Sequence, residues 1–171
     1  MKKMIALMLV MALAVSMTAC GGKTAAADKT PLAGTMEENA LKIMEIAPVE
    51  FMGTVIPVDM TDADTVWYFT GLSSAEKITD VAVYESMMGS QAFSLIMVRV
   101  ADATDAEAVA KEMTDNIDTR KWICVGADQK VVAGYGDAVM LIMLDSQLGL
   151  ETQSYVDAFK SICGGELDFT I

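Results

Sequence analysis

The sequence predicts an α+β domain built on an antiparallel sheet of about four to five strands, with helices packed on one face and two short helices before it. Two observations predict this class. Short apolar segments typical of strands are interspersed with longer segments of helical periodicity. The order strand, strand, helix also occurs twice, over residues 78–117 and over residues 130–163. That order indicates either an internal ββα repeat or a chance likeness of two α+β segments.

The first helix is predicted by its N-terminal motif. Thr35 and Glu38 have the spacing of a capping box, in which each side chain accepts a hydrogen bond from the other residue's backbone amide. The helix should run to about Ile46, because Pro48 follows soon after. Its apolar side should carry Ala40, Leu41 and Met44. The next residues, 49–58, should be irregular with at most a short extended piece.

A second, shorter helix should begin at Thr61 or Asp62, run through Phe69 and close at Gly71. Three acidic side chains lie near its start, namely Asp59, Asp62 and Asp64. They lack the spacing, the glycine and the terminal glutamate of a calcium-binding loop. Capping and solvation are therefore the preferred interpretation.

Two strands and a helix follow. Residues 78–84 alternate and predict a strand, and residues 93–100 are apolar nearly throughout, as expected of a strand buried on most of both faces. Thr104 and Glu107 have the spacing of a second capping box. The helix after it should extend to about Ile117, with an apolar stripe of Val109, Ala110, Met113 and Ile117.

The C-terminal part contains the second strand, strand, helix unit. Strands over residues 130–133 and 138–144 should be joined by a glycine-rich turn at residues 134–137. A helix over about residues 151–162 should end at the two glycines that follow it. Residues 167–171 alternate, so they either add a short edge strand or fray.

The N-terminus has the pattern of a secretory signal. Lys2 and Lys3 precede an uncharged apolar run that ends in Met17-Thr18-Ala19-Cys20, which resembles a lipobox. The alternative, a retained transmembrane helix, is less favoured because the run is shorter than the roughly 20 residues that span a bilayer. We therefore expect a signal peptide over residues 1–19, a flexible tether over residues 20–34 and a single α+β domain over residues 35–171.

This pattern predicts a location. By resemblance to bacterial lipoproteins, Cys20 is expected to carry a diacylglycerol with acyl chains such as palmitate. Two acyl chains attach a protein stably to a bilayer. The domain is therefore expected at the extracytoplasmic face of the cell membrane, held there by the lipid on Cys20.

The charge of the chain restricts its partners. The full chain has 12 basic and 24 acidic residues. Lys2 and Lys3 lie in the predicted signal, so the remainder has 10 basic and 24 acidic residues and a net charge of −14. Phosphate repels such a domain, so no nucleic-acid partner is expected. Acidity can serve solubility alone, and a cationic or peptide partner stays open.

The chain has no histidine. Nucleophile systems that use imidazole as the base are thereby excluded, and most zinc sites are made improbable. We expect no catalytic residue, no cofactor and no metal site. Cys124 and Cys163 lie in apolar stretches, so two buried free thiols are preferred over a disulfide between them.

One run combines charge with an aromatic residue. Residues 118–126 predict a tight turn that leads into a strand. Arg120, Lys121 and Trp122 within it are candidate ligand-binding residues for a carboxylate or phosphate group. The competing interpretation is structural: Asp118 caps the turn, the cations pair with neighbouring acids and Trp122 belongs to the core.

The run Asn116-Ile117-Asp118-Thr119-Arg120-Lys121-Trp122-Ile123-Cys124-Val125 resembles the signature of a family of small lipoproteins from Gram-positive anaerobes, the domain of unknown function 4358. The resemblance extends to the lipobox, the tether and the capped helix. Many members have proline where this chain has Thr119. The resemblance implies a compartment and a domain boundary, and it assigns no catalytic or ligand-binding residue.

Two groups of apolar residues are candidates for exposure. Trp67, Tyr68 and Phe69 are consecutive in a predicted helix, so they cannot share one face and at least one should lie at a rim. Met87 and Met88 lie in the predicted loop between two strands, where methionine suits an adaptable binding surface. Most of the other methionines fall at apolar strand or helix positions, where filling the core is the preferred interpretation.

The preferred hypothesis is a non-enzymatic, membrane-anchored lipoprotein that binds an unknown protein or small-molecule partner. The alternative is an envelope hydrolase or transferase that uses carboxylates. The absence of a serine nucleophile elbow and of a phosphate-binding loop weighs against it. A purely structural envelope component is a third hypothesis.

Overall fold

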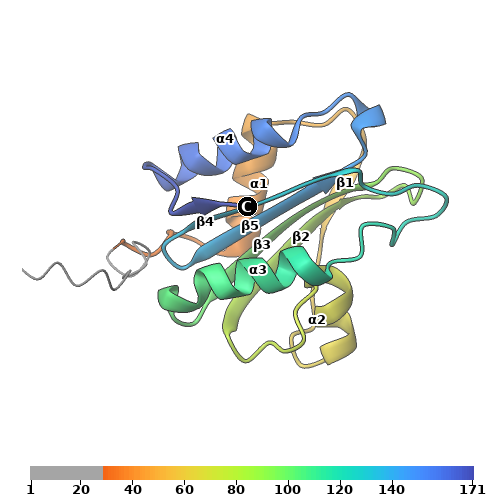
Figure 1. Cartoon of the computed structure of the whole chain (residues 1–171). Coiled ribbons are helices and arrows are strands. Elements are labelled where there is room, and N and C mark those ends of the chain that lie inside the picture. Colours follow the sequence, from red (N-terminus) through yellow and green to blue (C-terminus); the bar gives the residue numbers. More distant parts are fainter. Residues whose placement is uncertain (1–28) are drawn as a thin grey trace, which may run out of the picture.

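A single six-stranded antiparallel sheet forms the centre of the α+β fold in a computed structural model of the chain, which describes residues 29–171 (Figure 1). The predicted class is confirmed, with more strands than expected. The strand order is β1-β2-β3-β5-β4-β6. The predicted lipobox, Cys20 and the first part of the tether lie outside the described residues. The strands are β1 Gly53–Ile56, β2 Ile78–Ser86, β3 Phe93–Val100, β4 Gln129–Tyr135, β5 Ala138–Leu144 and β6 Phe169–Thr170.

Helices cover both faces of this sheet, so the prediction of helices on one face is wrong. The helices are α1 Met36–Ile46, α2 Ala63–Thr70, α3 Ala106–Asn116 and α4 Thr152–Cys163. Figure 1 shows α1 and α4 on one face and α2 and α3 on the other. All residues of β5 are buried, with alternate side chains in two separate core clusters. A central strand that is apolar at successive positions needs cover on both faces.

The two ββα segments do not form a spatial repeat. The helix α3 follows the β2–β3 hairpin but lies against β4 and β5. The helix α4 lies against the same two strands from the opposite face. A duplicated unit would place each helix in the same position relative to its own hairpin, so the repeated order of elements is not matched by a repeated arrangement.

The first predicted capping box is confirmed. Glu38 N donates to Thr35 Oγ1 at 3.1 Å, and Thr35 N donates to Glu38 Oε2 at 3.0 Å. Asn39 is buried on this helix, whereas the predicted apolar-side residue Leu41 is 42% exposed. The Asn39 amide is satisfied there because it donates to the carbonyls of Ala33 and Thr35.

The other helix ends show one confirmation and one correction. Asp62 caps α2 by accepting from Asp64 N, and Gly71 ends it with φ of 75°. The predicted capping box of Thr104 and Glu107 is wrong. Asp102 instead accepts from both the amide and the hydroxyl of Thr104, because a short 3-10 turn precedes α3.

Residues 29–34 lie against the sheet, so the predicted tether of residues 20–34 is too long at its C-terminal end. Lys29 Nζ lies 2.7 Å from Asp168 Oδ1. Leu32 is buried, and its amide donates to Asp137 Oδ1 at 2.9 Å. Arg99 donates to the Leu32 carbonyl at 2.7 Å and pairs with Asp137. The folded domain therefore includes Lys29.

The predicted strand after residue 118 is wrong. Residues 118–128 form a loop that connects α3 to β4 and closes through a 2.8 Å hydrogen bond from Ala127 N to Thr119 O. Cys124 adopts φ of 63°, which is incompatible with a strand. Cys124 is exposed and Cys163 is half-buried, and both thiols are free. The free state agrees with the preferred interpretation, but the predicted burial of Cys124 is wrong.

The C-terminal hairpin and edge strand are close to the prediction. The turn between β4 and β5 is shorter than predicted and consists of Gly136 and Asp137. Gly134 belongs to β4 and leaves room for the ring of Phe169, which a side chain on Gly134 would overlap. Of the two alternatives left open for residues 167–171, the structure forms the edge strand: β6 pairs with β4.

Candidate functional site

Three segments meet at one end of the sheet and expose apolar side chains there. Met87 N donates to Met52 O at 2.9 Å, and Ile123 N donates to Gly89 O at 3.0 Å. These bonds hold the chain before β1, the β2–β3 loop and the α3–β4 loop together. Four side chains at this junction are strongly exposed: Met52 at 72%, Met87 at 62%, Met88 at 54% and Ile123 at 74%. We call these four residues the apolar tip.

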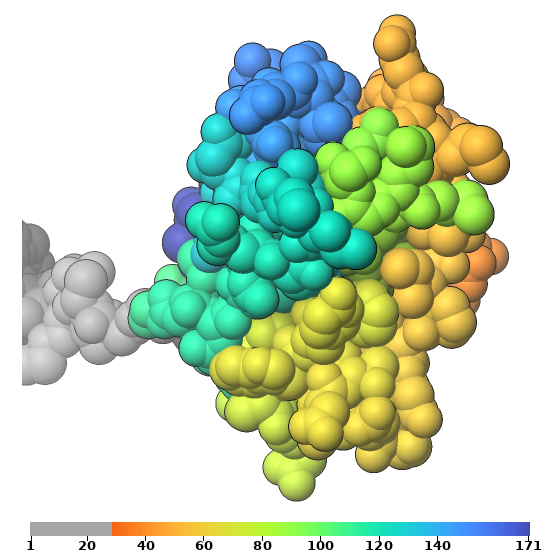
Figure 2. Space-filling view, turned by 90° about the vertical axis from the view of Figure 1, so that its right-hand side faces the viewer, coloured from red at the N-terminus to blue at the C-terminus, as the bar shows by residue number. Residues whose placement is uncertain are grey.

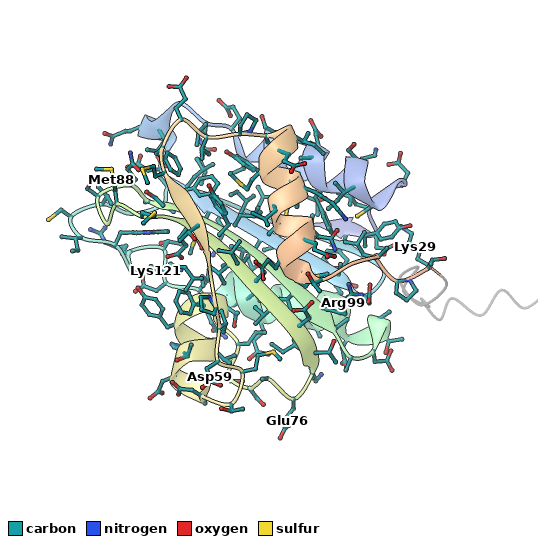
Figure 3. All side chains as sticks on the ribbon, turned by 180° about the vertical axis from the view of Figure 1, so that it is seen from behind. Lys29, Asp59, Glu76, Met88, Arg99 and Lys121 are labelled. Atoms are coloured by element: carbon teal, nitrogen blue, oxygen red, sulfur yellow. The ribbon has the colours of Figure 1, made fainter. Side chains whose placement is uncertain are left out.

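The apolar tip lies at the end of the molecule opposite Lys29. In the β3–β5 register, Phe93 at the tip end pairs with Leu144, and Arg99 at the other end pairs with Ala138 beside the β4–β5 hairpin. Lys29 lies next to that hairpin. Figure 2 faces the tip end, and Figure 3 labels Met88 and Lys29 at opposite sides of the molecule.

A buried ion pair fixes the α3–β4 loop to the sheet beneath the tip. The side chain of Lys121 is 1% exposed, and its Nζ lies 2.5 Å from Glu85 Oε1 on β2. Ser94 on β3 donates to the same oxygen at 2.8 Å. The Lys–Glu contact is close but is not aligned as a hydrogen bond. In the protein interior, the carboxylate of Glu85 thus lies beside the Lys121 ammonium group and accepts a hydrogen bond from the Ser94 hydroxyl.

Aromatic rings complete the surroundings of Lys121. Its Nζ lies 5.3 Å from the ring centre of Tyr68, and 5.4 Å from the rings of both Phe69 and Trp122. Burial lowers the pKa of Lys121, and the carboxylate of Glu85 opposes this shift. Three rings and one carboxylate therefore keep a desolvated ammonium group in place.

The structure separates the three predicted ligand-binding residues. Lys121 and Trp122 lie together in the buried cluster, where the Lys121 ammonium group is already paired with the Glu85 carboxylate. Arg120 is exposed and has no ion pair among residues 29–171. Asp118 accepts from Arg120 N at 2.8 Å and so caps the turn. This geometry favours the structural interpretation for Asp118, Lys121 and Trp122. Arg120, Lys121 and Trp122 do not form a pocket for an anion.

The predicted exposure of apolar residues is confirmed at both places. Met87 and Met88 belong to the apolar tip, and Trp67 and Tyr68 are each 47% exposed. Sequence reasoning missed the two most exposed members of the tip. Met52 lies in an irregular stretch, and Ile123 lies in the segment for which a strand was predicted. Neither position carries a local signal, because backbone contacts between distant segments place them together.

Four acidic side chains with lowered pKa values serve turns and helix ends. Hydrogen bonds from Thr61 lower the pKa of Asp59, and hydrogen bonds from Ser146 lower that of Asp128. Hydrogen bonds from neighbouring threonines likewise lower the pKa values of Asp62 and Asp102. A general acid needs a raised pKa, which is the opposite direction. No three potential metal-ligating side chains lie close enough within residues 29–171 to hold a metal ion.

Shallow cavities lie elsewhere on the described surface. One of about 330 Å³ lies between the end of α1 and the start of α4, lined by Ala47, Leu150 and Tyr155 among others. Another of about 320 Å³ lies beside the N-terminus of α1 and includes Glu37 and Asp80. Asp80 is engaged there because it accepts from Met36 N at 2.8 Å. Neither cavity includes a residue of the Lys121 cluster.

Comparisons with known proteins give no match: no family model fits the chain, and neither a curated protein nor a solved structure is similar to it. Membership of the domain of unknown function 4358 family therefore stays a prediction from the sequence. Within residues 29–171, no helix combines the length and the apolar composition that a bilayer crossing requires.

Proposed function

We propose that this protein is a lipid-anchored extracytoplasmic module, of the domain of unknown function 4358 family, that binds a protein partner through its apolar tip. The observation that carries the proposal is the position of the tip: four exposed apolar side chains lie on three segments that are hydrogen-bonded to one another, at the end of the sheet opposite Lys29. Contiguous exposed apolar surface on a soluble domain marks interaction sites.

The position of Lys29 relates the tip to the proposed anchor. The segment from Cys20 to Lys29 spans at most about 30 Å when fully extended. A lipid on Cys20 therefore keeps the Lys29 end near the bilayer. The apolar tip lies at the other end of the sheet, so it is accessible to other envelope proteins when the Lys29 end faces the membrane.

The shape of the tip favours a protein over a small molecule. Small ligands are bound in concave sites that bury most of their surface. The tip side chains are instead 54–74% exposed and project from loops. Methionine side chains are flexible and polarizable, so they adapt to an apolar partner surface. A hydrolase or transferase that uses carboxylates receives no such specific support from the described residues.

Site-specific crosslinking on whole cells tests the proposed partner binding. A photoreactive amino acid is introduced at Met88 in the tip and, as the matched control, at Leu41, an exposed apolar residue on α1. We expect a discrete crosslinked product from position 88 that is absent from position 41. Equal product patterns from both positions, or no product from position 88, would contradict the proposal.

The proposed anchor has a separate test. Cells are labelled with a fatty acid precursor while they express the wild-type chain or a Cys20→Ala variant. We expect label in the wild type only, because the thioether forms on that sulfur. Label that persists in the variant would refute anchoring through Cys20 and would leave the binding role of the tip unaffected.

A further inference from the structure

We propose that the partner of the apolar tip is a basic amphipathic segment, with apolar side chains on one face and lysine or arginine beside them. This inference rests on the proposed function and names the chemistry of its partner. It follows from the charges around the tip, where carboxylates outnumber cations. The tip supplies the apolar contact, and the charges decide which apolar segments are accepted.

Carboxylates surround the tip from three segments. Glu50 precedes Met52 closely in the chain and is exposed. Asp118 and Asp128 lie at the two ends of the loop that carries Ile123, and both are exposed. Asp145 lies at the same end of the sheet. Its amide donates to Ala92 O at 2.9 Å, just before β3 begins. Four carboxylates thus flank one apolar surface.

The cations at this end compensate only part of that negative charge. Lys121 is buried and paired with Glu85, so the two charges cancel. Lys130 donates to the carbonyl of Thr114 at 2.5 Å, at the C-terminal end of α3. Among the described residues near the tip, Arg120 is the exposed cation. Four carboxylates against the two remaining cations, Arg120 and Lys130, leave this end net negative.

The combination of flexible apolar side chains and carboxylates defines the partner class. Methionines adapt to apolar side chains of different shapes, so they bind many apolar sequences with little discrimination. Carboxylates at the rim attract cationic partners and repel anionic ones. An amphipathic segment that presents apolar residues at helical spacing beside lysine or arginine satisfies both requirements.

The same charges disfavour other occupants. A second copy would bring an equally negative tip against this one, at a cost from like charges. An anionic bilayer surface would repel the tip for the same reason. Dimerisation is an outcome that the experiment separates from peptide binding.

The test uses the full chain in an uncharged detergent and a fluorescent peptide of about 18 residues made only of Leu and Lys at amphipathic helical spacing. The comparison peptide has Glu in place of every Lys, so its apolar face is the same. Binding is followed by fluorescence anisotropy. We expect the Lys peptide to bind at least about tenfold more tightly than the Glu peptide, and added salt to reduce the difference.

Two sets of variants locate the binding surface. In the tip variant, Met52, Met87, Met88 and Ile123 are replaced by Ser, and its control carries Leu41→Ser and Ile171→Ser, which are exposed apolar residues elsewhere. In the charge variant, Glu50→Gln, Asp118→Asn and Asp128→Asn are combined. Its control carries Glu37→Gln, Glu76→Gln and Glu107→Gln, which lie away from the tip, so the net charge of the two chains is equal. We expect each tip-end variant, but neither control, to bind the Lys peptide roughly tenfold more weakly.

The outcomes distinguish the inference from the proposed function. Equal binding of the Lys and Glu peptides, lost in the tip variant, overturns the basic partner class while the tip remains a docking surface. Equal weakening by the charge variant and its control shows that net charge alone attracts the peptide, and this also overturns the inference. Concentration-dependent dimerisation that the tip variant abolishes assigns the surface to a second copy. Binding that persists in the tip variant overturns the inference, whereas failure of the proposed function is decided separately by the crosslinking at position 88.

Discussion

The two ends of the sheet use the same chemistry but expose different surfaces. At one end Lys29 pairs with Asp168 and lies 4.3 Å from the ring centre of Tyr135. At the other end Lys121 pairs with Glu85 among three aromatic rings. Each ion pair fixes a segment that lacks regular secondary structure.

The difference lies in what the fixed segment leaves in solvent. Residues 29–34 direct Leu32 into the core, whereas the loop fixed by Lys121 leaves Ile123 exposed beside the methionines. The exposed side chains of the tip are therefore carried on a backbone that is already ordered. Ordering before binding reduces the entropy cost of association. Exposure at the tip does not mean that the loop is loosely attached.

The largest effect is expected from breaking the ion pair beneath the tip. Lys121→Met leaves the buried carboxylate of Glu85 without its counter-charge, which should lower the free energy of unfolding by about 3–5 kcal/mol. Adding Glu85→Gln removes that charge and keeps an oxygen for Ser94, so the double variant should regain much of the loss. Urea denaturation measures both. A double variant no more stable than Lys121→Met would show that the charge is not the cause.

The matching change at the other end should cost less. Lys29→Met leaves Asp168 beside a hydrogen bond from Gly136 N, and the lysine side chain is 25% exposed. Asp168 loses its counter-charge but keeps that hydrogen bond, and water can replace the partly exposed ammonium group, so the expected loss is about 1–3 kcal/mol. The measurement is again urea denaturation. A loss equal to that of Lys121→Met would remove the contrast between the two ends.

Local parts of this fold could be predicted from the sequence, and its long-range parts could not. The capping box at Thr35 and the αL glycine at Gly71 depend on neighbouring residues, so their spacing is sufficient. The sheet faces were misjudged, although the apolar run of β3 already required cover on both sides. Strand propensity near Trp122 was overridden because burying Lys121 against Glu85 turns the chain there.

The candidate site shows the same limit. Met87 and Met88 could be identified because a loop between two strands exposes its side chains. Met52 and Ile123 join them only through backbone hydrogen bonds between segments that are far apart in the chain. The partner of Lys121 was likewise unpredictable, because many acidic residues are available and spacing does not select Glu85.

The pH dependence of stability should report on the ion pair at the tip end. Because burial lowers the pKa of Lys121 below its usual 10.5, the unfolded chain binds more protons than the native one in the window below that value. The contribution of Lys121 to the free energy of unfolding should therefore increase as pH rises toward 10.5. The measurement compares wild type with the Lys121→Met, Glu85→Gln double variant at about pH 8 and about pH 9, below the range in which Tyr68, whose pKa burial and Glu85 raise, loses its proton. Cys163, whose pKa burial raises to about 12, contributes equally to both chains and cancels. A difference that shrinks with pH would contradict the lowered pKa.

The smallest effect is expected for the two free thiols, which lie at opposite ends of the sheet. Their rates of modification measure how accessible each end is. Cys124 follows Ile123 and is exposed, whereas Cys163 lines a cavity with Leu32 near Lys29. Burial raises the pKa of Cys163 to about 12, so very little thiolate is available there at neutral pH. In a Cys20→Ser background, maleimide at about pH 7 should modify Cys124 well before Cys163, as mass spectrometry of the peptides would measure.

The basic peptide should slow the modification of Cys124 and leave that of Cys163 unchanged, because only one end is covered. Equal protection of both thiols would indicate a global change on binding and would end the distinction between the two ends.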